Sequence, residues 1–374
     1  MESNPTIRTW TPTTFILLFF IVAGSAAIVY RLIFGLGATT NLNDSYPWGF
    51  WLGLDVLGGV AMAAGGFIIA CAVYIFNWKK YRPIVRPAIL TAFLGYLMAV
   101  VAICLDIGHP FRIWHPMFMW QYHSVMWVVA MHVIFYTTTL ALEFSPMLFE
   151  RLGWEKARKA VGRVMVGAVI FGVMLSTLHQ SSLGAVYLIA ESKMSPLWWD
   201  TKLPFQFLVS AVAMGLAMVS LETMLSRKFL GHEVDKEIFY GLARGTLIIL
   251  FFYLLLKLYQ LFVVAGVGLA FDGSLEANMY LLEMLIGVVI PVALLAMKSV
   301  RTNIHRIFSI NLMVITGVLL NRLNVGLFSM ETYFSSQGMS YSPTWMEFLV
   351  SLGIISLGIF LYKMSAKHLP LFSH

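Results

Sequence analysis

Long apolar runs, about ten of them and each about 20 residues in length, set the fold of this chain. The runs do not alternate between polar and apolar residues, so they predict helices rather than the strands of a barrel. A membrane offers no water to backbone N–H and C=O groups, and helices satisfy those groups internally. Only 11% of the residues are charged, whereas soluble domains carry about 25%. We therefore predict an all-α integral membrane protein.

The expected spans follow from apolar length and polar punctuation. The first run, Phe15 to Leu36, is too long for the core of a cleavable signal peptide, so we expect it to remain as a spanning helix. The predicted spans are 13–36, 48–76, 87–106, 121–145, 162–188, 204–225, 239–264, 277–297, 306–322 and 345–363.

The spans are predicted to form a single membrane domain over residues 1–374. Pro47–Gly66 and Pro204–Glu222 share a proline followed by a similar pattern of small residues, which is a weak sign of two related helical bundles. We expect bundle halves near 48–190 and 204–322, with the first and last helices at the periphery.

Basic residues separate the connecting segments into two groups. The segments 77–86, 146–161, 226–238 and 298–305, with the neighbouring helix ends and both termini, contain all but six of the 25 Lys and Arg residues. The positive-inside rule then places both termini in the cytoplasm of a bacterial or archaeal cell, with the protein in its cytoplasmic membrane. It also accounts for the net charge of +7 without a nucleic-acid partner. The six exceptions are Arg31, Arg112, Lys193, Lys202, Lys257 and Arg322.

Cofactor ligands are scarce in the sequence. Cys71 and Cys104 lie inside apolar runs and are not spaced as a CxxC pair, so they predict no iron–sulfur or zinc site. Within the spans, only His123, His132 and His179 are candidate haem ligands, and their depths do not form the two matched pairs of a di-haem cytochrome b. We predict no haem, iron–sulfur cluster or metal ion in this chain.

Ionisable residues converge on the outer half of the predicted membrane domain. At 1.5 Å of rise per residue, Lys257 and His179 lie close to the outer surface, and Asp55 and Glu283 lie about 10 Å below it. His132 is expected near mid-membrane. Charges at membrane depth are expensive and usually functional, although long side chains such as Lys257 can also reach the interface singly.

Two local clusters stand out in this outer half. His179-Gln180-Ser181-Ser182 supplies donors and acceptors near the end of a helix, which suits a quinone head group but also suits polar contacts between helices. Asp106-Ile-Gly-His109-Pro, with Arg112 and His115, follows a helix end broken by glycine and proline. This second cluster could orient a head group, pair with Arg31 or Lys257, or dock a partner. The outer segments are also rich in tryptophan, and we expect most of these tryptophans to anchor the chain at the interface: Trp48, Trp51, Trp114, Trp120, Trp198, Trp199 and Trp345.

Several sequence blocks, in order along nearly the whole chain, resemble the NrfD/polysulfide-reductase-type membrane subunits, and within them the ten-helix, HybB-like branch of nickel–iron hydrogenases. The resemblance implies a quinone-interacting subunit without a redox cofactor, on which a periplasmic ferredoxin-like iron–sulfur subunit docks. The remaining partners could be hydrogenase, multihaem-cytochrome or sulfur-enzyme subunits. The blocks are Asn41–Gly49, Val85-Arg86-Pro87, Asp106–His109, Ala141–Phe144, Leu148–Trp154, His179–Gly184 and Ser342–Glu347.

One position departs from the family pattern. Hydrogenase-type relatives carry an acid in the fourth helix, whereas the corresponding stretch here, Val128-Val-Ala-Met-His132, has none. Either His132 replaces that acid or the proton route is missing.

We therefore predict a membrane subunit of a respiratory redox complex that binds menaquinone or ubiquinone near the periplasmic face, with or without proton translocation. His179 and Asp106 are the predicted catalytic residues. Asp55, Glu283 and His132 are predicted to relay protons. The alternatives are a secondary transporter or ion pathway, and a structural anchor for a redox partner. The predicted quinone-binding residues are His179, Gln180, Ser181, Asp106, His109, Arg112 and Lys257.

Overall fold

A computed structural model describes residues 9–43, 46 and 48–372. Within these ranges the chain is entirely helical, and ten of its helices are long and apolar enough to cross a membrane. The predicted fold class and number of spans are thus confirmed. Asp44, Ser45 and Pro47 of the Asn41–Gly49 block lie outside the described residues, as do the extreme ends of the chain.

The spanning helices include four stretches of π-helix, at Leu52–Gly58, Cys71–Ile75, Gln260–Ala265 and Leu285–Val289. The α-helices are α1 (Pro12–Phe34), α2 (Gly59–Ala70), α3 (Arg82–Asp106), α4 (His115–Phe118), α5 (Val125–Leu152), α6 (Glu155–Val186), α7 (Leu203–Leu230), α8 (Lys236–Tyr259), α9 (Leu275–Met284), α10 (Ile290–Ala296), α11 (Lys298–Arg301), α12 (Ile304–Gly326), α13 (Glu331–Ser336) and α14 (Trp345–His368).

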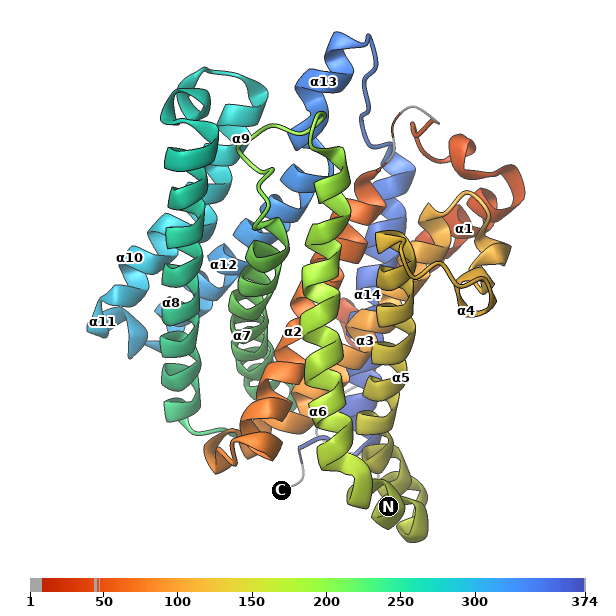
Figure 1. The fold of residues 1–374 in the computed structure, drawn as a ribbon. Coiled ribbons are helices and arrows are strands. Elements are labelled where there is room, and N and C mark those ends of the chain that lie inside the picture. The colour runs from red at the N-terminus through yellow and green to blue at the C-terminus, as the bar shows by residue number, and fades with distance from the viewer. Residues whose placement is uncertain (1–8, 44–45, 47, 373–374) are drawn as a thin grey trace.

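The helices fall into two groups and a peripheral pair. Helices α2, α3, α5 and α6 pack against one another, and α7, α8, α10 and α12 do the same, while α1 packs along α14 (Figure 1). Helices α2 and α7 cross at the centre, where a Cβ on Gly65 would lie 2.7 Å from the carbonyl oxygen of Gly215. Their spans are 72% and 78% buried, against 22% for α1. Helices α2 and α7 therefore lie in the interior of the helical domain, and α1 is largely exposed to the surroundings.

Both chain ends lie at one face of the molecule. Lys363 on α14 donates hydrogen bonds to the carbonyl of Thr9 (3.2 Å) and to the hydroxyls of Thr11 (3.1 Å) and Thr14 (2.7 Å). In Figure 1 this face is at the bottom, with the N and C marks. We call it the inner face and the opposite one the outer face, following the orientation predicted from the sequence.

The inner ends of α5 and α6 extend further than apolar length predicts. The segment 146–161, expected to be a loop, is helical except at Gly153 and Trp154. Charged residues there continue the helices beyond the apolar part, and Glu150 pairs with Arg86 of α3 at 3.0 Å. Two blocks of the family resemblance therefore meet in this ion pair.

Two long connections are joined at the outer face. Asn41 donates to the carbonyl of Ser342 (2.8 Å), and the hydroxyl of Tyr341 accepts from the backbone N–H of Phe50 (2.9 Å). Thr344 and Glu347 then form a capping box at the start of α14. Thr344 and Glu347 of the Ser342–Glu347 block are thus the residues that cap α14.

The expectation for the tryptophans holds only in part. Trp114, Trp120 and Trp345 are exposed, as interfacial anchors should be. Trp51 and Trp198 are each 1% exposed, and their indole N–H groups donate to the carbonyl of Glu347 (3.1 Å) and to the carboxylate of Glu283 (2.8 Å). Trp51 and Trp198 are thus internal hydrogen-bond donors to buried acceptors and not interfacial anchors.

Candidate functional site

Three clusters of buried and half-buried polar side chains contain several of the site residues predicted from the sequence, and we name each cluster after one member. The His179 cluster contains Tyr96, His132, Tyr136, Ser176, His179 and Ser182. The Asp106 cluster contains Arg31, Asp55, Asp106, Tyr341, Glu347 and Ser351. The Glu283 cluster contains Trp198, Ser210, Lys257, Glu283, Asn321, Arg322 and Asn324.

His179 on α6 is 0% exposed, and its ring lies between those of two other polar residues. The ring centroids are 5.7 Å from Tyr96 of α3 and 6.2 Å from His132 of α5. Neither nitrogen of His179 has a hydrogen-bond partner among the described residues. Since buried polar groups are nearly always satisfied, this imidazole is free to bind a ligand or water.

The neighbours of His179 have distinct roles. His132 Nδ1 lies 3.2 Å from the hydroxyl of Ser182, which itself donates to the backbone carbonyl of His179 (2.9 Å). Gln180 donates to the carbonyl of Val60 on α2 (2.9 Å), so its amide connects two helices while its own oxygen stays unpartnered. Ser181 is half-buried. Within the His179–Ser182 block, the alternative of polar contact between helices thus fits Gln180 best.

Further polar groups continue inward from His179. The rings of Tyr96 and Tyr136 meet edge to face at 4.6 Å, and the buried hydroxyl of Ser176 lies beside both tyrosine hydroxyls. About two turns inward from Tyr136 on α5, Glu143 is 5% exposed and forms no ion pair with any described residue. The pattern on α5 is His132, Tyr136 and Glu143, a helical spacing that sets all three on one face.

Arg31 of the Asp106 cluster is 2% exposed, so it does not reach water singly. Its guanidinium donates to the carbonyls of Leu105 (2.8 Å) and Ile107 (2.6 Å), which closes the C-terminus of α3 with a positive charge, where it is favourable. Asp106, at that same end, has one buried carboxylate oxygen without a hydrogen-bond partner among the described residues.

The other acids of this cluster are bound by α14 and the loop before it. Asp55 accepts from the hydroxyl of Ser351, and Glu347 accepts from the hydroxyl of Tyr341 and the backbone N–H of Thr344 (2.8 Å). Burial raises the pKa of Tyr341, so its hydroxyl remains a donor at physiological pH. The acids are thereby fixed in position under the outer face.

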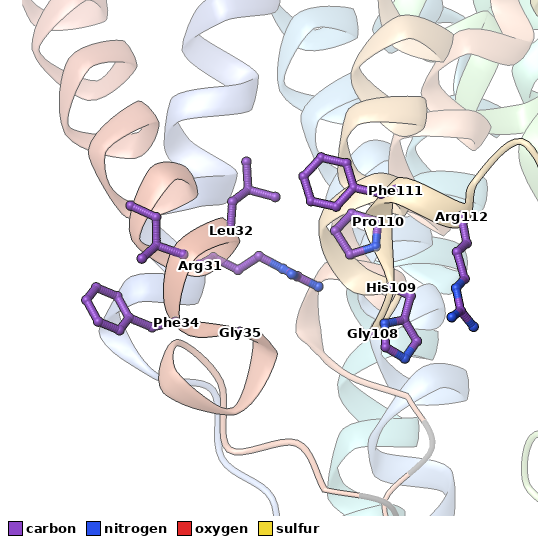
Figure 2. A pocket seen from close by; sticks show the side chains of 10 residues that line it. Arg31, Leu32, Phe34, Gly35, Gly108, His109, Pro110, Phe111 and Arg112 are labelled. Atoms are coloured by element: carbon purple, nitrogen blue, oxygen red, sulfur yellow. The ribbon is translucent and has the colours of Figure 1, made fainter.

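His109 and Arg112 lie apart from these buried groups. Both are exposed and line a pocket of about 380 Å³ between the outer end of α1 and the turn after α3 (Figure 2). The structure records no contact between either side chain and His179. The prediction that both help to form the quinone pocket stays a prediction.

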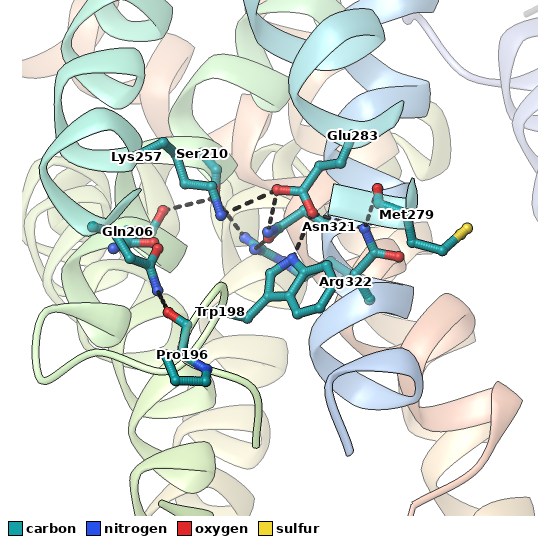
Figure 3. Close-up of polar contacts among 11 residues, drawn as sticks. Pro196, Trp198, Gln206, Ser210, Lys257, Met279, Glu283, Asn321 and Arg322 are labelled. Atoms are coloured by element: carbon teal, nitrogen blue, oxygen red, sulfur yellow. Dashed lines mark hydrogen bonds and ion pairs between the residues drawn. The ribbon is translucent and has the colours of Figure 1, made fainter. Parts of the chain in front are cut away.

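Lys257 belongs to the second group of helices, where it forms an ion pair with Glu283 at 3.3 Å (Figure 3). Each side chain is 1% exposed. Glu283 accepts three further hydrogen bonds, from Asn321 (2.9 Å), Asn324 (2.8 Å) and Trp198 (2.8 Å). Both carboxylate oxygens thus have donors beside them, which gives Glu283 a structural role; its predicted part in a proton relay stays a prediction.

Arg322 is 0% exposed and has only neutral partners in the described chain. It donates to Asn321 (2.6 Å), to the carbonyl of Phe207 (3.0 Å) and to Ser210 (2.9 Å), and it stacks on the Phe207 ring at 3.8 Å. With Lys257 and Glu283 it gives the cluster one excess positive charge. Sequence reasoning predicted Lys257 as a quinone-binding residue and assigned Arg322 no site role; the predicted role of Lys257 stays a prediction.

The predicted residues thus lie at four separate places in the structure. His179 lies with His132, Asp106 with Asp55, His109 with Arg112, and Lys257 with Glu283. Sequence reasoning missed Tyr96, Tyr136, Glu143 and Ser176, although the helical spacing of α5 carried a signal for Tyr136 and Glu143. Among the described residues, no three His, Cys, Asp or Glu side chains are placed to hold a metal ion.

Comparison with known proteins shows which family and which proteins the chain is related to. Residues 38–328 match the family model described as polysulphide reductase, NrfD. The chain is 34% identical to the "probable Ni/Fe-hydrogenase 2 b-type cytochrome subunit" of Escherichia coli, over 94% of this chain and 90% of that one. It is 37% identical to a protein of Nitratidesulfovibrio vulgaris, over 100% of this chain and 98% of that one. It is 28% identical to the "menaquinone reductase, integral membrane subunit" of the same organism, over 96% and 90%. The resemblance recognised in the sequence is confirmed, and the chain belongs to the NrfD polysulphide reductase family.

Proposed function

We propose that this chain is the integral membrane subunit of a respiratory oxidoreductase complex and binds a quinone, menaquinone or ubiquinone, in the His179 cluster. Two electrons pass between the quinone and a periplasmic ferredoxin-like iron–sulfur subunit docked on the outer face. Two protons accompany them, because reduction of a quinone to a quinol takes up both.

One observation carries this proposal: a fully buried imidazole with both nitrogens unpartnered, beside a second histidine and a tyrosine hydroxyl. A quinone carbonyl needs a hydrogen-bond donor that can also deliver a proton, and neutral histidine meets both requirements. Asp106, about three turns nearer the outer face on α3 than Tyr96, supplies a second group for proton exchange.

The relatives support the assignment to a multi-subunit complex. One is named as part of a nickel–iron hydrogenase and another as part of a menaquinone reductase. The name of the E. coli relative also mentions a b-type cytochrome. The His179 ring contacts the rings of His132 and Tyr96, so these histidines lie against each other and not on two sides of a haem. We therefore expect an optical spectrum of the purified chain to lack haem bands.

Replacement of His179 by glutamine tests the proposal. Glutamine keeps a donor and an acceptor but cannot exchange a proton, and loss of one acid–base group lowers turnover by about 10²- to 10⁴-fold. In the assembled complex, quinone-dependent turnover should fall while electron transfer from the partner enzyme to a water-soluble dye stays unchanged. His305→Gln, at an exposed position near the inner face, is the matched control. Wild-type quinone turnover in His179→Gln would refute the assignment.

Proton translocation is a second element of the proposed function, supported by the polar residues inward of His179. Glu143, Tyr136, Ser176 and Tyr96 lead from the inner half of the domain towards His179, and the Ser176 hydroxyl lies beside both tyrosine hydroxyls. A lone buried carboxyl group in the membrane is a functional feature by default. Glu143 would then take over the part of the acid that the fourth helix lacks at Val128–His132.

This route is tested by Glu143→Gln in liposomes that contain the complex. If protons for quinone reduction come from the inner side through Glu143, the variant should lose most of its proton uptake there and its quinone turnover should fall with it. The exposed Glu155→Gln, at the inner end of α6, is the control. Unchanged proton uptake in Glu143→Gln would exclude the route and leave the quinone site itself untouched.

A further inference from the structure

The outer flank pocket lies where a membrane-spanning helix ends beside an irregular turn. Its walls come from Arg31–Gly35 of α1 and from Gly108–Arg112 after α3, and its volume is about 380 Å³. Arg31 holds the two walls together through its hydrogen bonds to the carbonyls of Leu105 and Ile107, at the end of α3. The pocket is therefore built into the fold.

One side of this pocket is apolar and faces the surroundings of the membrane domain. Phe34 is 63% exposed and Phe111 is 81% exposed, although both are large aromatic residues. In Figure 2 the rings of Phe111 and Pro110 are turned towards Leu32 on α1. Such an exposed apolar surface on a spanning helix suits an acyl chain.

The other side of the pocket is basic. In Figure 2, His109 and Arg112 lie away from the Phe111 ring, on the far side of the turn. The Arg112 guanidinium has no ion-pair or hydrogen-bond partner among the described residues, and none of the ten residues that line the pocket is acidic. No Asp or Glu occurs between Ile107 and Leu142 in the sequence. The nearest acid along the chain, Asp106, interacts with Arg31, so Arg112 has no paired acid among the described residues.

We propose that this pocket is a binding site for one anionic phospholipid of the outer leaflet. The phosphate accepts hydrogen bonds from Arg112 and His109, since a guanidinium matches a phosphate in geometry and charge. The acyl chain runs between Leu32 and Phe111, which are turned towards each other in Figure 2. Exposed Trp114 and Trp120 on the same connection mark the head-group level. This proposal assigns His109 and Arg112 to a lipid phosphate in place of the quinone head group predicted for them from the sequence.

Native mass spectrometry of the purified chain tests this site. Phosphatidylglycerol or phosphatidylcholine is added at equal concentration, and the fraction of protein that retains one lipid is measured. We expect retention of phosphatidylglycerol over phosphatidylcholine, and about fivefold weaker phosphatidylglycerol binding in Arg112→Gln, the usual contribution of one basic side chain near an anionic membrane. Arg163→Gln, an exposed basic position near the inner end of α6, should bind like the wild type.

Two further arms separate the lipid from other occupants. Glycerol phosphate carries the phosphate without acyl chains, and it should not displace phosphatidylglycerol. Phe111→Ala should weaken lipid retention while the thermal unfolding temperature stays at the wild-type value, because this ring is exposed. Equal retention of the two lipids, unchanged binding in Arg112→Gln, or displacement of the lipid by a neutral quinone would each overturn the proposal.

Discussion

Glu283 shows at the residue scale how a charge can be kept inside a membrane domain. Its two oxygens accept from Asn321, Asn324 and Trp198 and pair with Lys257, so the carboxylate exchanges its hydration shell for protein donors. Lys257 and Arg322 lie in the same enclosure without a second described carboxylate. Removal of the single anion should therefore be more damaging than removal of a whole pair.

We expect Glu283→Gln to destabilise the protein by about 3–5 kcal/mol, because two buried cations lose their carboxylate. The double variant Glu283→Gln with Lys257→Met keeps the net charge of the wild-type cluster, and it should be more stable than Glu283→Gln alone. Thermal unfolding of the purified protein in detergent measures both. Equal unfolding temperatures of the single and double variants would contradict a coupled pair.

Sequence reasoning at the residue scale identified the depth of the ionisable groups but not their partners. Arg31, Lys257 and Arg322 all lie near helix ends, which is compatible with contact to water. Their actual partners come from other helices: the Leu105 carbonyl for Arg31, Glu283 for Lys257 and the Phe207 carbonyl for Arg322. Partner choice depends on how helices rotate and cross, and no local pattern encodes that.

Irregular helix geometry accompanies these residues at the element scale. Asp55 lies within the π-helical stretch Leu52–Gly58, and Glu283 and Lys257 precede the stretches Leu285–Val289 and Gln260–Ala265. A π-turn rotates the side chains that follow it and is often found at functional sites. The apolar runs predicted the number of spans correctly but gave no sign of these turns, since hydropathy does not depend on hydrogen-bond register.

Close contact of two elements offers a direct test of the packing. A Cβ on Gly287 would lie 2.5 Å from the Cα of Gly317 on α12, so the two backbones touch. Gly317→Ala should destabilise the second group of helices by about 1–3 kcal/mol through overpacking. The control is Gly162→Ala on α6, where nothing lies within 4 Å and alanine should be neutral or slightly stabilising. Thermal unfolding of the two variants compares them, and equal stability would rule out the contact.

The two faces of the whole molecule differ in the polar and charged residues near them. The three named clusters lie towards the outer face, whereas Glu222 and Tyr362 form a further buried polar contact nearer the inner face, where the Lys- and Arg-rich segments and both chain ends lie. The sequence predicted this asymmetry because both charge bias and helix position are local properties. The distribution of the polar residues over three clusters could not be predicted, because it follows from which helices share a bundle.

Orientation in the membrane decides whether the proposed quinone site exchanges electrons with a periplasmic partner. The scarcity of Lys and Arg in the outer segments predicts that this face is translocated. Alkaline phosphatase inserted after Gly338, in the exposed connection before α14, should be active outside the cell, and an insertion after Glu233, between α7 and α8, should not. A fluorescent protein at the C-terminus should fold and fluoresce in the cytoplasm. The reverse pattern would show that the molecule has the opposite orientation in the membrane, with His179 and Asp106 near the cytoplasm. A periplasmic iron–sulfur subunit could not reach them there.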